Sequence, residues 1–485
     1  MISARAFTLG LTAVVGSGLV LGGATIAREP LGNDEIASLA LVSRPVGAFA
    51  SDFVSSQSAG MLFHAVLWPI VALGGVSSFW LRLPSLLAFA GAIAVCGLVG
   101  ARLGGRAVGL CAALFLSVCP FAILHAQDAR MYSFALLFSL LAFWALLRSL
   151  ETPTGARWAT YAATVAATGY SHEFALLTVV AHVPLVLADT RATTRKQFAL
   201  ALVGSAAILV PLGAVSLHNR GLDPLYYVTA PGVAAIEDTV LVIVGSRPAV
   251  AACALVIASG IVAALRMRRA FTASERRRGS AIAVSLALWL VGPFALLFAA
   301  SQIDPIFSPR YVISSAAAAC LGIALLLAFL PRRLGVAGVF VIALAFGYGT
   351  IQQSRSLDRA DWPGAATWLR STAGAGPIVL VGGQRNAAAL LYYSPGLGVP
   401  RTELPWTEAE LARLPPKLTL IDRDNSVSDL RAAVSRTPAW VVEQGRVAPG
   451  LQRAFDAFLD SCQTAAEAEL RLISIRRVVR CPHAG

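Results

Sequence analysis

The chain has 485 residues, of which 57% are hydrophobic and only 13% are charged, and its mean hydropathy is +0.70. Soluble globular domains carry about 25% charged residues, so the composition excludes an ordinary soluble protein and predicts a polytopic α-helical membrane protein. The formal net charge is +13, but the basic residues gather in short loops between apolar runs, as in membrane proteins with positive cytoplasmic loops. We therefore do not expect nucleic-acid binding.

Apolar runs recur along the first three-quarters of the chain, and about eleven of them have the length that a bilayer-spanning helix needs. They cover residues 6–26, 83–101, 107–125, 131–148, 158–171, 174–189, 198–217, 248–265, 281–300, 312–330 and 335–351. The first run can also be interpreted as a signal peptide, but it is longer than the usual apolar core of one. The shorter run at residues 61–76 predicts an interfacial or re-entrant helix.

Alternation of the spans across the bilayer sorts the polar residues onto two faces. The arginine-rich loops all fall on one face, which the bias of Lys and Arg identifies as cytoplasmic. The opposite face receives the first external loop, residues 27–80, and several polar residues of later loops: Asp128, Arg130, His172, Glu173, Asp304 and Arg310. Because independent assignments converge on this face, we expect the functional site there.

Two adjacent carboxylates, Asp34 and Glu35, follow the first apolar run directly. A carboxylate close to lipid is costly unless a water-filled site uses it, so this pair is a candidate functional site. The alternative is a solvated loop in which Asp34 caps a helix over residues 35–43.

The tail, residues 352–485, has mixed charges, turn residues and short apolar runs, which predict a small external α/β domain. Strands are expected at residues 377–381, 418–421, 440–442 and 472–479, and helices at 365–371, 386–393, 427–435 and 451–466. The Gly382-Gly383-Gln384 stretch favours a plain strand–helix turn over a dinucleotide-binding loop, because its glycine pattern is incomplete. Cys462 and Cys481 form either a disulfide or two free thiols.

Several short motifs, in this order along the chain, resemble the signature of the GT-C glycosyltransferases. They are the acidic pair Asp34-Glu35, Arg82-Leu83-Pro84-Ser85, Gln127-Asp128-Ala129-Arg130-Met131-Tyr132, Phe307-Ser308-Pro309-Arg310-Tyr311 and Asp361-Trp362. In particular, the chain resembles the bacterial family-39-like transferases that use polyprenyl-phosphate sugars, relatives of protein mannosyltransferases and of the aminoarabinose transferase of lipid A. The resemblance covers the first three-quarters of the chain well and the tail loosely.

The resemblance implies a GT-C catalytic domain with about eleven transmembrane helices over residues 1–351 and an extracytoplasmic α/β domain over residues 352–485. The enzyme would sit in the bacterial inner membrane and move a mannose- or pentose-like sugar from a polyprenyl-phosphate donor to an extracytoplasmic glycan, lipid or protein of the cell envelope. No cofactor is implied. A membrane transporter or flippase is the alternative, but the spans are almost free of charge and show no internal repeat.

The resemblance also implies roles for individual residues. Asp34 would be the base that deprotonates the acceptor, with Glu35 supporting it, and the lack of an obvious second carboxylate nucleophile favours inversion. The expected ligands of the donor's lipid phosphate are Arg82, Arg130, Arg310 and Tyr311, and the expected acceptor or supporting residues are Asp128, Tyr132, His172 and Glu173. Asp128 and Arg130 could instead form a structural ion pair, and Arg310 could be an interfacial arginine.

No metal site is expected. His125, His172 and Glu173 all fall on the external face, but nothing in their spacing forces them to converge on one ion. A divalent metal is the weaker alternative, because a lipid phosphate and nearby arginines can balance each other's charge.

Overall fold

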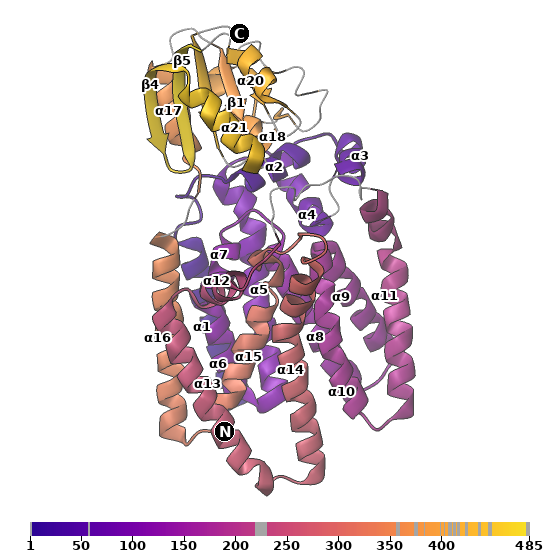
Figure 1. Ribbon diagram of the computed structural model, residues 1–485. Helices are drawn as coiled ribbons and strands as arrows, with labels where there is room; N and C mark the ends of the chain where they lie inside the picture. Colours follow the sequence, from indigo (N-terminus) through magenta and orange to yellow (C-terminus); the bar gives the residue numbers. More distant parts are fainter. Residues whose placement is uncertain are drawn as a thin grey trace.

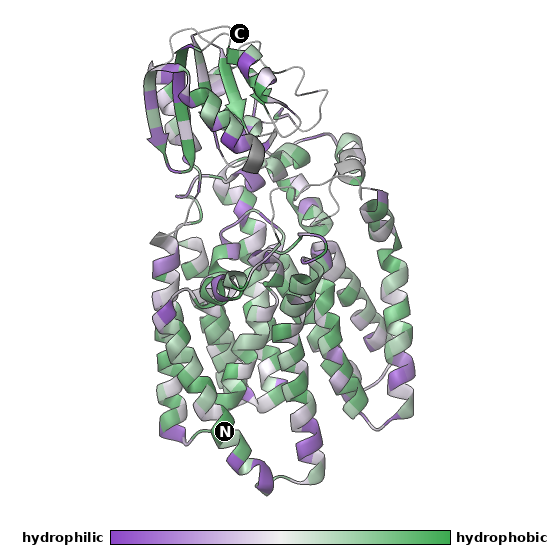
Figure 2. Cartoon of the chain, viewed as in Figure 1, coloured by the Kyte–Doolittle hydropathy of each residue, from purple (hydrophilic) through white to green (hydrophobic). Residues whose placement is uncertain are grey.

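The computed structural model describes residues 2–481 except 57–58, 219–229, 356–358, 373–376, 383, 398, 402, 406–409, 411–413, 415–417, 422–424, 435–437 and 445–448. A bundle of long helices forms one part of the molecule, and a sheet domain covers one end of it (Figure 1). The N-terminus lies at the opposite end of the bundle (Figure 1). Apolar residues run along the helices of the bundle, whereas hydrophilic residues gather at the helix ends and in the sheet domain (Figure 2).

The bundle is built from residues 4–355. Its helices are α1 (Ala4–Gly23), α2 (Asn33–Val42), α3 (Val46–Ser56), α4 (Met61–Ala72), α5 (Ser78–Gly104), α6 (Arg106–Ser117), α7 (Pro120–Ala126), α8 (Tyr132–Glu151), α9 (Gly155–Ser171), η1 (Glu173–His182), α10 (Val183–Ala188), α11 (Ala192–His218), α12 (Ala234–Val244), α13 (Arg247–Met267), η3 (Arg268–Ala270), α14 (Ala273–Ala300), η4 (Pro309–Val312), α15 (Ser315–Leu327) and α16 (Arg332–Arg355).

Within the described residues, seven helices are long and apolar enough to cross a membrane, or eight if the bent pair α6–α7 counts as one span. The chain is a multi-pass membrane protein, as predicted. The predicted count of about eleven spans is not confirmed. The remaining expected spans, at residues 158–171, 174–189 and 312–330, coincide with the shorter helices α9, η1–α10 and α15.

The break between α6 and α7 bends the chain by 60°. Pro120 occupies the first position of α7, where a proline is tolerated because the missing N–H would have no partner inside the helix. The bend turns the chain toward the segment 127–131 that joins α7 to α8 at the end of the bundle next to the sheet domain (Figure 1).

The sheet domain contains five strands in the order β2-β1-β3-β5-β4. They are β1 (Ile378–Val381), β2 (Leu418–Ile421), β3 (Ala439–Glu443), β4 (Gln463–Leu470) and β5 (Ile473–Arg480). Strand β1 lies between β2 and β3 and pairs with both in parallel, with Ile378 opposite Leu418 of β2 and Trp440 of β3. Strand β5 pairs with β3 antiparallel. The helices are α17 (Trp362–Thr372), α18 (Gln384–Tyr393), α20 (Val427–Val434) and α21 (Pro449–Asp460), and η5 (Pro395–Leu397) is a short turn.

Strand β4 lies where the sequence predicted the end of a helix. The expected helix over residues 451–466 ends at Asp460, and Gln463–Leu470 pairs with β5 instead. The segment is rich in Ala and Glu, which favour helices, but the edge of the sheet offers backbone partners that outweigh this propensity. The other four strands lie within a residue or two of their expected positions.

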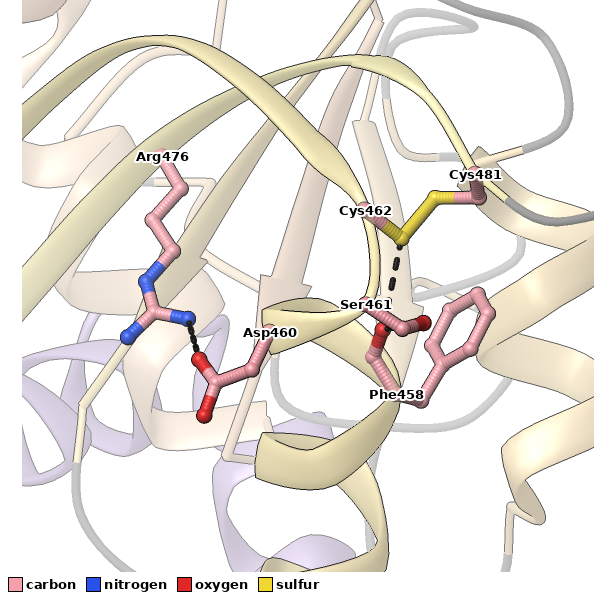
Figure 3. Close-up of a disulfide and its surroundings, with 6 residues drawn as sticks. All are labelled: Phe458, Asp460, Ser461, Cys462, Arg476 and Cys481. Carbon is pink, nitrogen blue, oxygen red and sulfur yellow. Dashed lines mark hydrogen bonds and ion pairs between the residues drawn. A yellow bond between two sulfur atoms is a disulfide. The ribbon is translucent and has the colours of Figure 1, made fainter.

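A disulfide joins Cys462 and Cys481 at the open end of the β4–β5 hairpin (Figure 3). The two residues are 19 positions apart in the sequence. On the last residue of α21, Asp460 accepts a hydrogen bond of 2.8 Å from Arg476 of β5. The structure therefore favours the disulfide over the two free thiols that the sequence left open.

Candidate active site

Helix α2 begins with Asn33, Asp34 and Glu35 and is buried along most of its length. Two carboxylates in the first turn interact favourably with the positive end of the helix dipole. The backbone N–H of Gly32 also donates to Glu35 Oε2 at 2.8 Å, which fixes the start of the helix. The acidic pair is therefore part of a buried helix and not of a solvated loop.

Glu35 is only 2% exposed and lies between two arginines. Arg82 of α5 donates to Oε1 from Nε at 2.7 Å and to Oε2 from Nη2 at 2.8 Å. Arg359 donates to Oε2 at 2.9 Å, and the backbone N–H of Ala129 donates to Oε1 at 2.8 Å. With Gly32, this gives the carboxylate a complete set of donors from four segments of the chain.

Arg82 is 1% exposed, and all five of its N–H groups are satisfied by protein atoms. Besides the two bonds to Glu35, Nη1 donates to the carbonyls of Ile26 (2.8 Å) and Glu29 (2.9 Å), and Nη2 donates to that of Pro30 (2.9 Å). A guanidinium has five N–H donors, so this arrangement leaves none for a phosphate. Arg82 and Glu35 instead hold the segment between α1 and α2 in place.

Asp34 lies one residue before Glu35 but is 26% exposed. Arg310 Nη1 donates to its Oδ2 at 2.9 Å, and Arg385 Nη1 donates to its Oδ1 at 2.7 Å. Burial tends to raise the pKa of this carboxyl, but the charges of Arg130, Arg385 and Arg310 outweigh burial and hold its pKa well below the usual range. Asp34 is therefore a carboxylate at neutral pH, with arginines on both oxygens.

Arg130 provides a third cation beside this carboxylate. Its Nη1 donates to Ser38 Oγ at 3.0 Å and to the backbone carbonyl of Asp34 at 3.3 Å. Its Nε is buried and has no hydrogen-bond partner among the described residues. Unlike Arg82, Arg130 therefore has an N–H donor that the described residues do not use.

Two aromatic rings lie close to the Arg310 guanidinium. Its central carbon lies 5.9 Å from the ring centre of Tyr132 and 5.7 Å from that of Tyr311, within the range of cation–π attraction. The His172 ring lies 5.8 Å from Tyr132 and 5.0 Å from Tyr311, and His125 lies 4.6 Å from Tyr132. Within the described part of the chain, no ring nitrogen of either histidine has a hydrogen-bond partner.

The remaining predicted site residues have different surroundings. Asp128 Oδ2 lies 3.9 Å from His125 Nδ1, which is too long for a hydrogen bond, and Asp128 interacts electrostatically with Arg130 and Arg359. Glu173 begins η1, and its carboxylate accepts a hydrogen bond of 3.4 Å from Ser216 of α11. The structure thus brings Arg82, Arg130 and Arg310 into contact with α2. Tyr132 and Tyr311 lie beside Arg310, and His172 lies beside both tyrosines. Glu173 pairs with a neighbouring helix instead.

The sheet domain contributes residues that sequence reasoning missed. Asn33 Nδ2 donates to Asn386 Oδ1 and Gln444 Oε1, both at 2.6 Å, and Asn33 Oδ1 accepts from Trp362 Nε1 at 2.6 Å. Together with the bonds from Arg359 and Arg385, each of the first three residues of α2 contacts the chain after α16. Only Asp361-Trp362 had been singled out in the sequence, because nothing in hydropathy or spacing shows where the tail docks.

Positive charge exceeds negative charge in this cluster. Five guanidinium groups lie among three carboxylates, so two positive charges remain unbalanced. The arginines are Arg82, Arg130, Arg310, Arg359 and Arg385, and the acids are Asp34, Glu35 and Asp128. No group of three or more His, Cys, Asp or Glu side chains that could hold a metal ion occurs in the described ranges. The cluster is suited to an anion.

Neither the known family models nor the curated proteins include a match to this sequence. Solved structures do match. ArnT from Cupriavidus metallidurans in the apo state, an aminoarabinose transferase, has a TM-score of 0.61 at 14% identity over 98% of both chains. The same protein bound to undecaprenyl phosphate has a TM-score of 0.60 at 13% identity, again over 98% of both chains.

A second similar protein is the oligosaccharyltransferase AglB from Archaeoglobus fulgidus, in complex with an inhibitory peptide and a dolichol-phosphate. It has a TM-score of 0.53 at 12% identity over 90% of this chain and 69% of that one. At such identities the likeness is one of fold. The chain has the GT-C glycosyltransferase fold that the sequence motifs predicted.

Proposed function

We propose that this protein is a glycosyltransferase that moves a sugar from a polyprenyl-phosphate donor to a hydroxyl group of an acceptor, with Asp34 as the base. The observation that carries the proposal is the surroundings of Asp34. A partly exposed carboxylate is paired with two arginines, Arg310 and Arg385, and a third, Arg130, donates to the backbone carbonyl of the same residue. The cluster has excess positive charge. A base and an anion-binding group are the two parts that such a transfer requires.

The charge excess suits the leaving group. A sugar phosphodiester carries one negative charge, and the lipid phosphate that it releases carries about −1.5 to −2 at neutral pH. Negative charge therefore grows during the reaction. Donors that are already in place where charge develops stabilise the transition state, and guanidinium groups bind phosphate oxygens in pairs. Arg130, Arg310 and Tyr311 are proposed as donor-binding residues on this basis.

The chemical step is a single displacement. The Asp34 carboxylate accepts the proton of the acceptor hydroxyl, whose oxygen forms a bond to the anomeric carbon of the sugar. The bond from that carbon to the phosphate oxygen breaks, and its electron pair leaves with the lipid phosphate. The products are the glycosylated acceptor, the polyprenyl phosphate and a protonated Asp34, with inversion at the anomeric carbon.

The structural neighbours support a lipid phosphate as the carrier. ArnT is described with undecaprenyl phosphate, and AglB with a dolichol-phosphate and a peptide. We propose a mannose- or pentose-like sugar, a glycan, lipid or protein acceptor, and a bacterial inner-membrane location with the sheet domain outside. The excess of arginine in the loops at the opposite end of the bundle supports this orientation.

The contacts of the other predicted site residues refine their roles. We propose that Glu35 and Arg82 are positioning residues, because their hydrogen-bonding groups are occupied by one another, by Arg359 and by the backbone. Tyr132 and His172 are proposed to orient Arg310 and Tyr311 through ring contacts. Asp128 and Glu173 remain supporting residues in this proposal.

The test uses the purified full-length protein in nanodiscs with labelled polyprenyl-phosphate sugars and an acceptor membrane extract. Loss of a positioned general base typically lowers the rate by roughly 10²–10⁴-fold, and we expect this for Asp34→Asn. Asp304→Asn is the matched control, because Asp304 is an exposed acid outside the cluster. Equal transfer by wild type and Asp34→Asn would exclude Asp34 as the base. No transfer with any donor, together with substrate flux in liposomes, would support a transporter instead.

A further inference from the structure

The side chain of Arg385 crosses from the sheet domain to the carboxylate of α2. It lies in the first turn of α18, and its Nη1 donates to Asp34 Oδ1 at 2.7 Å. Arg310 occupies the other oxygen, Oδ2, at 2.9 Å. Both oxygens of the proposed base are therefore paired with a guanidinium, and an acceptor hydroxyl needs one of them within about 2.6–3.2 Å.

The two arginines are held differently. Arg310 is 29% exposed and lies against the rings of Tyr132 and Tyr311. Arg385 is 40% exposed, and Asp34 is its only hydrogen-bond partner among the described residues. Its Nε and second amino group are available to another acceptor. Of the two, Arg385 is the more exposed and the less restrained, and therefore the one better able to exchange Asp34 for a ligand.

The backbone that carries Arg385 is fixed to α2. The side chain of Asn386 is 2% exposed, accepts from Asn33 at 2.6 Å, and donates to the carbonyls of Val381 (3.3 Å) and Gln444 (2.7 Å). Just before α18, Gly382 adopts a φ of +117°, and a side chain there would collide with Gln444. The helix therefore stays in place, and only the long side chain of Arg385 needs to move.

We propose that Arg385 is a ligand of the donor phosphate and that this phosphate and Asp34 compete for it. This inference rests on the proposed function. When the phosphate takes Arg385, Oδ1 of Asp34 becomes free to accept the acceptor's proton. The sheet domain thereby supplies a donor-binding residue, and the base is uncovered only after the donor has bound.

The electrostatics are consistent with this order of events. Burial raises the pKa of Asp34, but the charges of Arg130, Arg385 and Arg310 lower it further than burial raises it, so the carboxylate is a weak base in this arrangement. A general base works best when its pKa lies near the operating pH. Moving one guanidinium from Asp34 to a phosphate raises the basicity of Asp34 at the moment when the acceptor must be deprotonated.

The first experiment measures the binding of a long-chain polyprenyl phosphate to the full-length protein in zwitterionic nanodiscs. We expect Arg385→Gln to weaken binding about tenfold, which corresponds to about 1.4 kcal/mol. The control is Arg453→Gln, because Arg453 is an exposed arginine of the same domain, on α21, and the substitution removes the same charge. Affinity of Arg385→Gln equal to that of wild type would overturn the inference.

The second experiment tests competition, which a purely structural role of Arg385 does not predict. In a protein that keeps Arg385, the substitution Asp34→Asn removes the competing anion, so we expect it to tighten polyprenyl phosphate binding several-fold. In the Arg385→Gln background the same substitution should tighten binding much less. Binding that is weakened or unchanged by Asp34→Asn in the Arg385 background would overturn the inference.

The outcomes separate this inference from the proposed function. A wild-type protein that binds no polyprenyl phosphate would overturn both. A wild-type protein that binds it and transfers sugar, with an Arg385→Gln variant that does so with the same donor KM, would overturn only the role of Arg385. A raised donor KM in Arg385→Gln, with the unfolding temperature of wild type, would support the inference.

Discussion

Asp34 and Glu35 are neighbours in the sequence but have opposite surroundings. Successive residues of an α-helix point about 100° apart, so one side chain faces the cluster around Arg310 and the other enters the core beside Arg82. Glu35 is 2% exposed and Asp34 is 26% exposed. Environment thus separates two similar carboxylates: Glu35 is enclosed by donors, whereas Asp34, which we propose as the base, stays partly exposed.

Glu35→Gln is expected to destabilise the protein strongly. Removing one partner of a buried charge pair typically costs about 3–5 kcal/mol, because it leaves the other charge uncompensated, and here both Arg82 and Arg359 would lose an anion. The measurement is the apparent unfolding temperature in detergent. Asp34→Asn is the comparison, and we expect a smaller shift for it. A Glu35→Gln variant as stable as wild type would contradict the structural role.

Arg310→Lys is expected to reduce transfer even though the charge is kept. Lysine lacks the planar fork that binds phosphate oxygens in pairs and stacks on aromatic rings, and Arg310 lies over Tyr132 and Tyr311. We expect a loss of roughly tenfold or more in kcat/KM, equivalent to about 1.4 kcal/mol in the barrier. The control is Arg453→Lys. Full activity of Arg310→Lys would show that charge alone suffices.

At the scale of secondary-structure elements, His64 of α4 links this helix to α2. Its Nδ1 donates to the carbonyl of Gly60 at 2.9 Å, and its Nε2 lies 3.2 Å from Ser38 Oγ. Burial and, to a smaller degree, the charge of Arg130 lower the pKa of His64 to about 3, against the effect of the Gly60 carbonyl. The folded protein therefore keeps His64 neutral.

The lowered pKa of His64 predicts acid sensitivity. The unfolded chain takes up a proton near pH 6.5, whereas the folded chain does so only near pH 3. The stability contribution of His64 is therefore complete above pH 6.5 and is lost as the pH falls toward 3. We expect the unfolding temperature of His64→Gln to fall less between pH 7 and pH 4.5 than that of wild type. Parallel curves would refute this.

The length and hydropathy of elements were predictable, and their distant contacts were not. Long apolar runs indicated most spans, because the hydropathy of a run is visible without knowledge of its neighbours. The alternation of spans across the bilayer predicted Asp34 and Arg310 on the same face, and in the structure Arg310 Nη1 lies 2.9 Å from Asp34 Oδ2. The strand β4 was missed because its composition favours a helix. Arg359 and Arg385 were missed because docking of the tail depends on tertiary packing, which no periodicity in the sequence records.

At the scale of the whole molecule, the sheet domain and the bundle form one site. The start of α2 receives Arg385, Asn386, Gln444 and Trp362 from the sheet domain. Another bond joins Leu31 N–H to the hydroxyl of Tyr393 at the end of α18, at 2.6 Å. The sheet domain thus contributes directly to the site. The site must therefore lie on the same side of the membrane as the sheet domain.

The disulfide offers a test of that compartment. Disulfides persist in oxidising environments and are rare in the cytosol, so we expect mass spectrometry of unreduced protein to link the peptides of Cys462 and Cys481. Closing a loop with a sequence separation of 19 residues stabilises a fold by about 3 kcal/mol in the chain-entropy description. The double variant Cys462→Ser/Cys481→Ser should unfold at a lower temperature. Free thiols at both positions in protein from intact cells would argue against an external domain.

The acids and arginines of the cluster come from distant parts of the sequence, and this affects when the cluster can form during biosynthesis. A nascent chain delivers the α2 carboxylates first, Arg82 next, and Arg359 and Arg385 only after the last long helix of the bundle. Domains generally fold in the order of synthesis. Asp34 and Glu35 therefore cannot form their ion pairs with Arg385 and Arg359 until most of the chain has been synthesised. A ribosome-stalled or proteolysed chain that lacks the tail would contain the helices of the bundle, α1 to α16, but not the complete charge cluster. Under the proposed function, such a chain could not use the donor.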